Sequence, residues 1–229
     1  MTRRIIVAID GPAGAGKSTV ARRVADRLGC IYIDSGAMYR CVALWALRNR
    51  TPLDDMHRLE QLAREAKIDF APGSPVVLLN GEDVTEAIRD RQVTDAASKV
   101  SAIPGVRRAL VKLQRGIGEH ASVVMEGRDI GTVVFPEADV KIFLDANHSV
   151  RTGRRVRQMT TAGKAAEQDE VASDLDERDR RDRTRSESPL VQAPDAVYVD
   201  TTGMSIDEVE QELLRIIRER TSNGKEIKR

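Results

Sequence analysis

Short apolar runs alternate along the chain with stretches in which hydrophobic residues recur at helical spacing. Residues 5–9 form a continuous apolar run, as expected of a central strand that is covered on both faces. Val20, Val24 and Leu28 lie on one face of a helix that we expect from Gly16 to about Leu28. The alternation continues with strands expected at 30–33, 122–125, 140–144 and 197–200, and with helices expected at 39–47, 104–119 and 205–220. Such alternation is typical of an α/β fold with a mostly parallel sheet and right-handed crossovers.

Two stretches depart from this alternation. Residues 62–100 contain short apolar runs at 68–70 and 76–79 beside turn-forming residues, which predicts a hairpin within an inserted subdomain. Residues 149–186 are dense in charge and poor in large apolar side chains, and we expect their centre, 160–164, to be exposed and mobile.

The composition is that of an ordinary globular protein. The chain has 229 residues, of which 41% are hydrophobic and 32% charged, enough for one α/β domain with an insertion. Its net charge of +1 argues against a large electrostatic footprint, so we expect neither nucleic acid nor a membrane as a partner. The cysteines form no disulfide framework, no apolar run approaches a membrane span, and the first strand leaves no room for a signal peptide. We expect a cytoplasmic protein and a monomer.

A phosphate-loop pattern follows the first apolar run directly, as Gly11-Pro12-Ala13-Gly14-Ala15-Gly16-Lys17-Ser18. Its glycines allow a tight turn in which successive N–H groups point at phosphate oxygens, and the helix that follows adds the positive end of its dipole. We expect Lys17 to reach the β- and γ-phosphates and the Ser18 hydroxyl to bind Mg²⁺. Because a strand precedes the pattern and an amphipathic helix follows it, the chain is expected to bind a nucleoside triphosphate.

Three classes of phosphate-loop protein compete for this pattern. A GTPase would need a guanine-reading Asn-Lys-x-Asp segment, and only residues 66–69 bear a distant likeness to one. A motor ATPase would carry an acidic pair after an apolar strand, whereas residues 143–146 supply the single carboxylate of Asp145. A small-molecule or nucleotide kinase instead needs a second phosphate pocket built from arginines, and four segments of this chain offer candidates.

Two of these segments follow expected strands, whose ends open toward the ligand crevice of a parallel sheet. In the first, Ser35 and Arg40 are candidates to hold an acceptor and Asp34 to orient a water on Mg²⁺, although a helix N-cap with a solvated arginine explains the same residues. In the second, Arg128 offers a two-pronged donor to phosphate, and Asp129 an acceptor for a sugar hydroxyl or a base amine. A glycine-flanked turn with a surface ion pair is the alternative there.

The other two candidates are Arg107, which by itself would more often be a surface residue, and a charged run near the end of the dense stretch. In a helix, Arg178, Asp182 and Arg185 of that run fall on one face, toward a single ligand. Most mixed charge runs are solvated faces. The arginine-rich residues 151–155 favour function here, because a mobile segment bracketed by arginines is what a lid over a triphosphate requires.

Together these motifs resemble the bacterial cytidylate kinases, a family of phosphate-loop nucleoside monophosphate kinases. The resemblance runs from Ile5 to about Arg218 and is carried by four segments with their spacing, 10–19, 34–40, 127–136 and 178–185 with the following Pro189-Leu190. It implies a P-loop NTPase-type three-layer α/β/α fold with a five-stranded parallel sheet. The implied single kinase domain, 1–220, comprises a core (1–61, 101–150 and 169–220), a monophosphate-binding insertion (62–100) and a short lid (151–168), with a flexible tail at 221–229.

The resemblance also implies which residues hold each substrate. ATP would be held by Gly11, Pro12, Ala13, Gly14, Ala15, Gly16, Lys17, Ser18, Thr19 and Arg154. The pyrimidine nucleotide would be held by Ser35, Tyr39, Arg40, Ser98, Arg107, Arg128, Asp129, Arg178, Asp182 and Arg185. The residues implied to act in the reaction itself are Lys17, Arg128, Arg154 and Arg178.

Within the nucleotide site, the implied contacts divide by the part of the nucleotide. The acceptor phosphate would lie against Arg40, Arg128 and Arg178, the sugar near Asp182 and the base near Ser98, with cytosine or its ribose also touching Ser35, Arg107, Asp129 and Arg185. Mg²⁺ would be bound directly by Ser18 and through water by Asp34. Some members carry Gly in place of Ser18 and Asp in place of Glu126; serine is a sound Mg²⁺ ligand, whereas the role of Glu126 stays open.

The reaction implied is transfer of the γ-phosphoryl group of ATP to CMP or dCMP, which gives CDP or dCDP and ADP. Two alternatives remain at this point. One is a kinase for another nucleoside monophosphate, UMP or AMP, and the other is a nucleotide-binding regulator without turnover.

Overall fold

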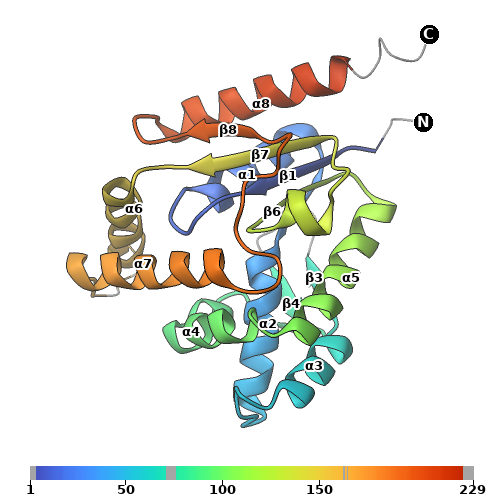
Figure 1. Cartoon of the computed structure of the whole chain (residues 1–229), viewed down its shortest axis with the longest axis vertical. Coiled ribbons are helices and arrows are strands. Elements are labelled where there is room, and N and C mark those ends of the chain that lie inside the picture. The colour runs from blue at the N-terminus through green and yellow to red at the C-terminus, as the bar shows by residue number, and fades with distance from the viewer. Residues whose placement is uncertain (1–3, 71–75, 162, 164, 224–229) are drawn as a thin grey trace.

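A five-stranded parallel sheet forms the centre of the molecule, with helices on both faces (Figure 1). Its strands lie in the order β2-β6-β1-β7-β8. Their bounds are β1 Ile6–Asp10, β2 Ile31–Asp34, β6 Val123–Gly127, β7 Val140–Asp145 and β8 Val197–Asp200. Every neighbouring pair in this sheet is parallel, so the expected five-stranded parallel sheet is confirmed.

The computed structural model describes residues 4–70, 76–161, 163 and 165–223. Positions 71–75 of the expected insertion, with the turn residues expected there, lie outside these residues, as do 162 and 164 of the expected lid and 224–229 of the expected tail. Among the described helices, none combines the length and the apolar composition that crossing a membrane requires.

Helices on the two faces of the sheet bury two separate apolar cores. On one face, α1 (Lys17–Leu28) and α8 (Ile206–Asn223) pack with the strands around the fully buried Leu213. On the other face, α2 (Ser35–Arg48) and α5 (Pro104–His120) form the second core. The result is the expected three-layer arrangement, except that α8 continues three residues beyond the expected end of the helix.

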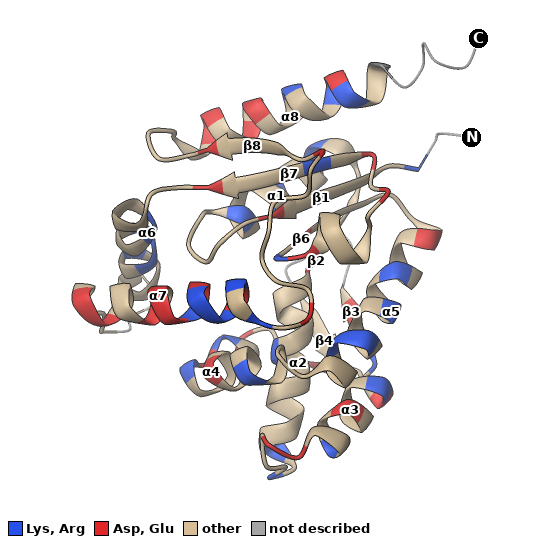
Figure 2. Ribbon diagram, viewed as in Figure 1, with Lys and Arg blue, Asp and Glu red and all other residues tan. Residues whose placement is uncertain are grey.

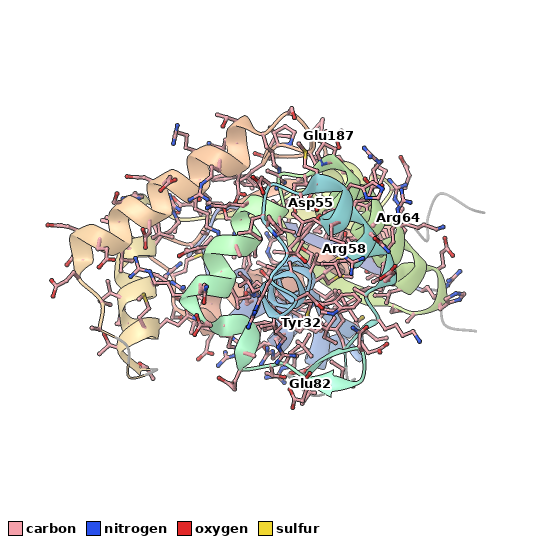
Figure 3. All side chains as sticks on the ribbon, turned by 90° about the horizontal axis from the view of Figure 1, so that it is seen from below. Tyr32, Asp55, Arg58, Arg64, Glu82 and Glu187 are labelled. Carbon is pink, nitrogen blue, oxygen red and sulfur yellow. The ribbon has the colours of Figure 1, made fainter. Side chains whose placement is uncertain are left out.

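The stretch expected as an insertion forms a lobe beside α2 (Figure 1). An antiparallel sheet of β3 (Ile68–Phe70), β4 (Val77–Leu79) and β5 (Glu82–Asp83) confirms the hairpin that the turn residues predicted. Around it lie three elements that we did not predict from the apolar pattern: α3 (Met56–Glu65), the 3₁₀ turn η1 (Ala87–Arg89) and α4 (Arg91–Val100). Asp55, labelled in Figure 3, begins α3 by accepting a hydrogen bond from the backbone N–H of Arg58 at 3.0 Å.

The charge-dense stretch forms two helices that pack on each other, α6 (His148–Thr161) and α7 (Gln168–Thr184). Because α6 follows β7 after a short turn, it starts at the carboxyl edge of the sheet. In α7, acidic residues gather in the first turn and arginines in the last, as the red and blue segments of Figure 2 show. This order complements the helix dipole.

The carboxyl ends of three neighbouring strands bring the motif segments together. The phosphate loop follows β1 at Asp10, whose partner across the sheet is Gly127 at the end of β6. Asp34 at the end of β2 pairs in turn with Glu126. Since parallel strands end at the same edge, the phosphate loop and the segments that carry Arg40 and Arg128 meet there.

Candidate active site

A cavity of about 1270 Å³ opens at this edge of the sheet. The phosphate loop lines it from Ala13 to Thr19, and Asp34 and Arg154 line it as well. All the residues expected to hold the nucleotide also lie in its wall: Ser35, Tyr39, Arg40, Ser98, Arg107, Arg128, Asp129, Arg178, Asp182 and Arg185. Gly11 and Pro12 are buried and do not line it. The structure therefore brings the glycine-rich loop and the arginine segments to one cavity.

Glycine is required at specific points of the loop. Gly11 and Gly16 adopt φ values of +147° and +92°, which other residues rarely adopt. A Cβ added at Gly11 would overlap the carbonyl oxygen of Leu144, so the loop passes too close to β7 for any side chain. Gly16 stands directly before the first turn of α1, whose free N–H groups and dipole favour an anion.

Lys17 is buried against the loop that carries it. Its Nζ donates to the backbone oxygen of Pro12 at 2.7 Å, and the residue is only 5% exposed. Burial, together with the nearby charge of Arg128, lowers the pKa of Lys17 to about 7. A phosphate in the cavity would restore its full charge, because an anion at short range stabilises the ammonium form.

Arginines crowd the other part of the cavity. The Nε of Arg128 donates to Asp182 Oδ2 at 2.8 Å, and the Nη2 of Arg40 donates to Asp34 Oδ2 at 2.6 Å. Arg178 makes no hydrogen bond or ion pair with another described residue, and burial and the charge of Arg128 lower its pKa to about 10. Cationic side chains held this close favour a bound anion, because it would relieve their mutual repulsion.

A second group of charges surrounds Arg107, near the start of α5. Arg107 is 2% exposed, so it is not the solvated surface residue that its own segment suggested. Its guanidinium donates to the Asp129 carboxylate and lies 5.3 Å from the ring centre of Tyr39. Arg185 lies 3.7 Å from Asp129 and 3.8 Å from Asp182. This cluster offers both donors and a carboxylate acceptor, the groups needed to read the edge of a base.

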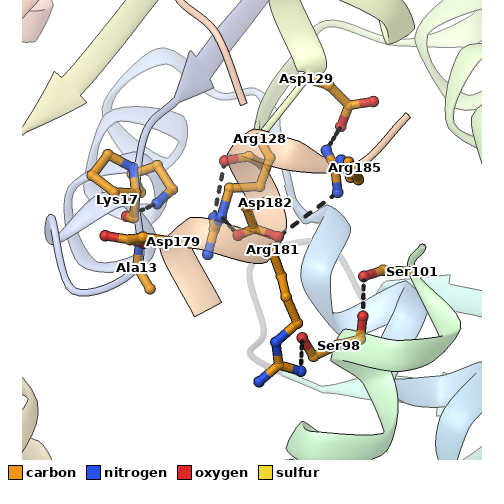
Figure 4. Close-up of polar contacts among 12 residues, drawn as sticks. Ala13, Lys17, Ser98, Ser101, Arg128, Asp129, Asp179, Arg181, Asp182 and Arg185 are labelled. Carbon is orange, nitrogen blue, oxygen red and sulfur yellow. Dashed lines mark hydrogen bonds and ion pairs between the residues drawn. The ribbon is translucent and has the colours of Figure 1, made fainter. Parts of the chain in front are cut away.

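Two serines complete the wall on this side. The Oγ of Ser98, on α4, accepts a hydrogen bond from Arg181 Nη1 at 2.8 Å, as Figure 4 shows. Ser35 is 5% exposed, and a Cβ added at Gly127 would come within 2.6 Å of its Oγ. Gly127 therefore leaves the space that the Ser35 hydroxyl occupies.

Ser18, Asp34 and Glu126 line the same part of the cavity. Glu126 is buried and accepts a hydrogen bond from the Tyr32 hydroxyl at 2.8 Å. Burial raises the pKa of Glu126, with the charge of Asp34 adding to the rise. Burial also acts to raise the pKa of Asp34, but Arg40 and the N–H of Ala37, which Asp34 caps, lower it overall.

These donors suit Mg²⁺ held mainly by nucleotide oxygens and water. The described residues contain no group of three or more histidine, cysteine or acidic side chains able to hold a metal ion by themselves. One hydroxyl with nearby carboxylates is what Mg²⁺ takes in nucleotide sites, where phosphates and waters fill the remaining positions. Both alternatives raised for Asp34 thus involve the same side chain: it is a helix N-cap, and it also faces the cavity.

A pair of residues that the sequence reasoning missed supports the loop from α6 and α7. The Oδ1 of Asp179 accepts from the N–H of Ala13 at 3.2 Å, while Arg151 donates to the Ala13 carbonyl at 3.0 Å and to Asp179 Oδ2 at 2.5 Å. Arg154, one turn along α6, donates to the carbonyl of Thr201 at 2.7 Å and to that of Ala15 at 3.4 Å. The loop is therefore braced by the helices that carry the arginines.

Asp10 is a third residue whose role the sequence reasoning missed. Its carboxylate accepts from the N–H groups of Ile130 and Gly131 at 2.8 and 2.7 Å, and the residue is 5% exposed. Burial raises its pKa to about 6. Asp10 thereby ties the start of the phosphate loop to the turn that follows Arg128 and Asp129.

Comparison with known proteins identifies the family to which the chain belongs. The family model described as cytidylate kinase matches residues 7–219. The chain belongs to the cytidylate kinase family. It is 59% identical over 227 residues to the cytidylate kinase of Solibacter usitatus (strain Ellin6076), covering 98% of this chain and 97% of that protein. It is 47% identical over 222 residues to the cytidylate kinase of Ligilactobacillus salivarius (strain UCC118), covering 96% and 99% of the two chains.

The fold is shared more widely. A gluconokinase from Sinorhizobium meliloti 1021 superposes with a TM-score of 0.54 at 15% identity, over 99% of this chain and 100% of that one. At this identity the likeness concerns the fold alone. The resemblance drawn from the motifs and the expected phosphate-loop kinase fold are therefore confirmed by membership in the cytidylate kinase family and by this shared fold.

Proposed function

We propose that this protein transfers the γ-phosphoryl group of ATP to the 5′-phosphate of CMP or dCMP, giving CDP or dCDP and ADP. One observation carries the proposal: a glycine-rich anion loop and a cluster of buried and half-buried arginines line the same cavity. Membership in the cytidylate kinase family supports CMP as the acceptor and ATP as the donor, and it disfavours UMP and AMP kinases and a regulator without turnover.

The proposed reaction does not depend on a strong general base. An oxygen of the acceptor phosphate attacks the γ-phosphorus while the bond to the β–γ bridging oxygen breaks and ADP leaves. The acceptor oxygen is already anionic, so no strong general base is needed. Catalysis then rests on positioning and on neutralising charge, which falls to Lys17, Arg128, Arg154 and Arg178.

On the donor side, ATP would lie on the loop from Gly11 to Thr19, with Arg154 beside it. Ser18 would bind Mg²⁺ directly and Asp34 through water, with the Glu126 carboxylate lining the same cavity. Mg²⁺, when bound, neutralises part of the charge on the triphosphate oxygens.

On the acceptor side, one group of residues would contact the phosphate and another the sugar and base. Arg40, Arg128 and Arg178 would hold the acceptor phosphate, because the charges of Arg128 and Arg178 act on Lys17 and that of Arg40 acts on Arg178. The sugar and base would contact the other residues of the cavity wall: Ser35, Tyr39, Ser98, Arg107, Asp129, Asp182 and Arg185. The Asp129 carboxylate is suited to accept from the amino group of cytosine, a donor that uracil lacks.

Closure would complete the site. The lid at 151–168 and the insertion at 62–100 would move together over the substrates and exclude water, which otherwise hydrolyses ATP. A monomer in the cytoplasm remains our prediction for the state in which it works.

A single coupled assay tests the proposal. Purified protein is supplied with ATP, Mg²⁺ and one of CMP, dCMP, UMP, AMP or GMP, and ADP release is followed. We expect kcat/KM to be highest for CMP and dCMP. Preference for UMP or AMP would establish the alternative kinase, and ATP binding without turnover on any acceptor would establish the regulator.

A further inference from the structure

Arg181 links α7 to Ser98 of α4, and Ser98 lines the cavity. Its Nη1 donates to the Ser98 hydroxyl at 2.8 Å, and Figure 4 shows the side chain extending from α7 to that serine. The other charged contact of Arg181 is an ion pair with Glu177 on its own helix, at 3.1 Å. Of these two contacts, only the bond to Ser98 joins separate elements of the fold.

Ser98 is also connected, through Ser101, to the buried pair of Arg107 and Asp129. The Ser101 hydroxyl donates to the Ser98 carbonyl at 3.0 Å, and Arg107 Nη1 donates to the Ser101 carbonyl at 3.1 Å. Arg107 in turn donates to Asp129. Ser98 therefore contacts α7 directly and is linked to the buried Arg107–Asp129 pair through Ser101.

We propose that Arg181 is a positioning residue for base recognition, acting through Ser98. A serine side chain has three staggered rotamers and a freely rotating hydroxyl, so on its own it discriminates poorly between bases. A guanidinium only donates, so its bond fixes the Ser98 oxygen, occupies one lone pair and leaves the hydroxyl hydrogen for the ligand. Cytosine and uracil differ in the donors and acceptors at ring positions 3 and 4, and an oriented hydroxyl distinguishes such patterns. The inference rests on the proposed function.

The chain supplies a matched control on the same helix. Arg180 is exposed and its side chain makes no hydrogen bond or ion pair with a described residue. Replacing either arginine by methionine removes one charge from α7 and keeps a long side chain. The Arg181 side chain is itself 39% exposed, so neither variant leaves a cavity in the core.

The first experiment compares Arg181→Met, Arg180→Met and the wild-type protein in steady-state assays with CMP and UMP. We expect Arg181→Met to raise KM for CMP about tenfold and to narrow the preference for CMP over UMP, while KM for ATP changes less than about twofold. Arg180→Met should match wild type, and Arg181→Lys should recover part of the loss. Equal kinetics for the Arg181→Met and Arg180→Met proteins would overturn the proposal, as would a loss shared equally by CMP, UMP and ATP.

A double-mutant cycle then tests whether Arg181 acts through Ser98. If it does, adding Arg181→Met to Ser98→Ala costs little more in KM for CMP than Ser98→Ala alone. Fully additive losses would contradict the route through Ser98. A wild-type protein without activity on CMP would instead refute the proposed function, so the two failures are distinguishable.

Discussion

Arg151 and Asp179 form a buried ion pair, and both side chains hold the backbone of Ala13 in the phosphate loop. Arg151 lies on α6 and Asp179 on α7, next to Arg178. The carboxylate accepts the N–H of Ala13 and the guanidinium donates to its carbonyl, so both polar groups of one loop residue are satisfied from outside the loop. The donor loop is thereby placed relative to the helices that carry the acceptor arginines.

This relationship predicts a large effect of Asp179→Ala on stability. The substitution leaves the Arg151 charge buried without its partner, and we expect a loss of about 3–5 kcal/mol in the free energy of unfolding, measured with urea. Asp174→Ala is the control, because its side chain is 61% exposed and it pairs with Arg91 only at 3.6 Å. The control should change stability by less than about 1 kcal/mol, and similar losses in the two variants would contradict the prediction.

Lys17→Met should separate activity from stability. We expect kcat to fall at least about 100-fold, because a charge aimed at the transferring phosphoryl group is lost. The fold should be as stable as wild type or more so, since the buried ammonium, whose pKa is lowered to about 7, is replaced by an apolar chain of similar length. Lys112→Met, at an exposed position of α5, should leave both quantities unchanged. Near-normal turnover of the Lys17 variant would refute its assigned role.

Features that depend on local spacing were predictable from the sequence. The phosphate loop is recognisable because its glycines, Lys17 and Ser18 stand at fixed intervals between a strand and a helix. Arg178 and Asp182 share the cavity because helical periodicity places them on one face, whereas Arg185 reaches it from the extended residue that ends α7. Parallel strand ends explain why Asp34 and Arg128 come to the same edge.

Features that depend on distant pairing were not predictable. Asp10 bonds to Gly131 across 121 positions and Arg151 to Asp179 across 28, and neither pairing has a local signal. Arg107 is buried because Asp129 compensates its charge, whereas its own neighbours suggest only an exposed helix start. The helix α4 did carry a weak signal, since its buried residues recur at helical spacing; they are Val93, Ala96, Ala97 and Val100.

Arg178→Met should impair use of the acceptor more than binding of ATP. The guanidinium makes no hydrogen bond or ion pair with another described residue, so its loss removes mainly interactions with the acceptor phosphate. We expect KM for CMP to rise about 10- to 100-fold. KM for ATP should change by less than about threefold. Arg183→Met, exposed on the same helix, is the matched control and should behave as wild type. A larger effect on ATP than on CMP would assign Arg178 to the donor side instead.

Asp10 should make the folded protein less stable as the pH rises from about 4 to about 6. Burial raises its pKa from 3.8 to about 6, with Asp129 adding to the rise and Lys17 and the N–H groups of Ile130 and Gly131 opposing it. Between these values the folded state keeps a proton that the unfolded state releases, so the free energy of unfolding falls by about 3 kcal/mol across the window. Other carboxyl groups titrate in the same range, and urea unfolding of Asp10→Asn, which cannot titrate, isolates this contribution. The difference in stability between wild type and Asp10→Asn should therefore shift by that amount between pH 4 and pH 7, and a difference independent of pH would show that Asp10 is ionised throughout.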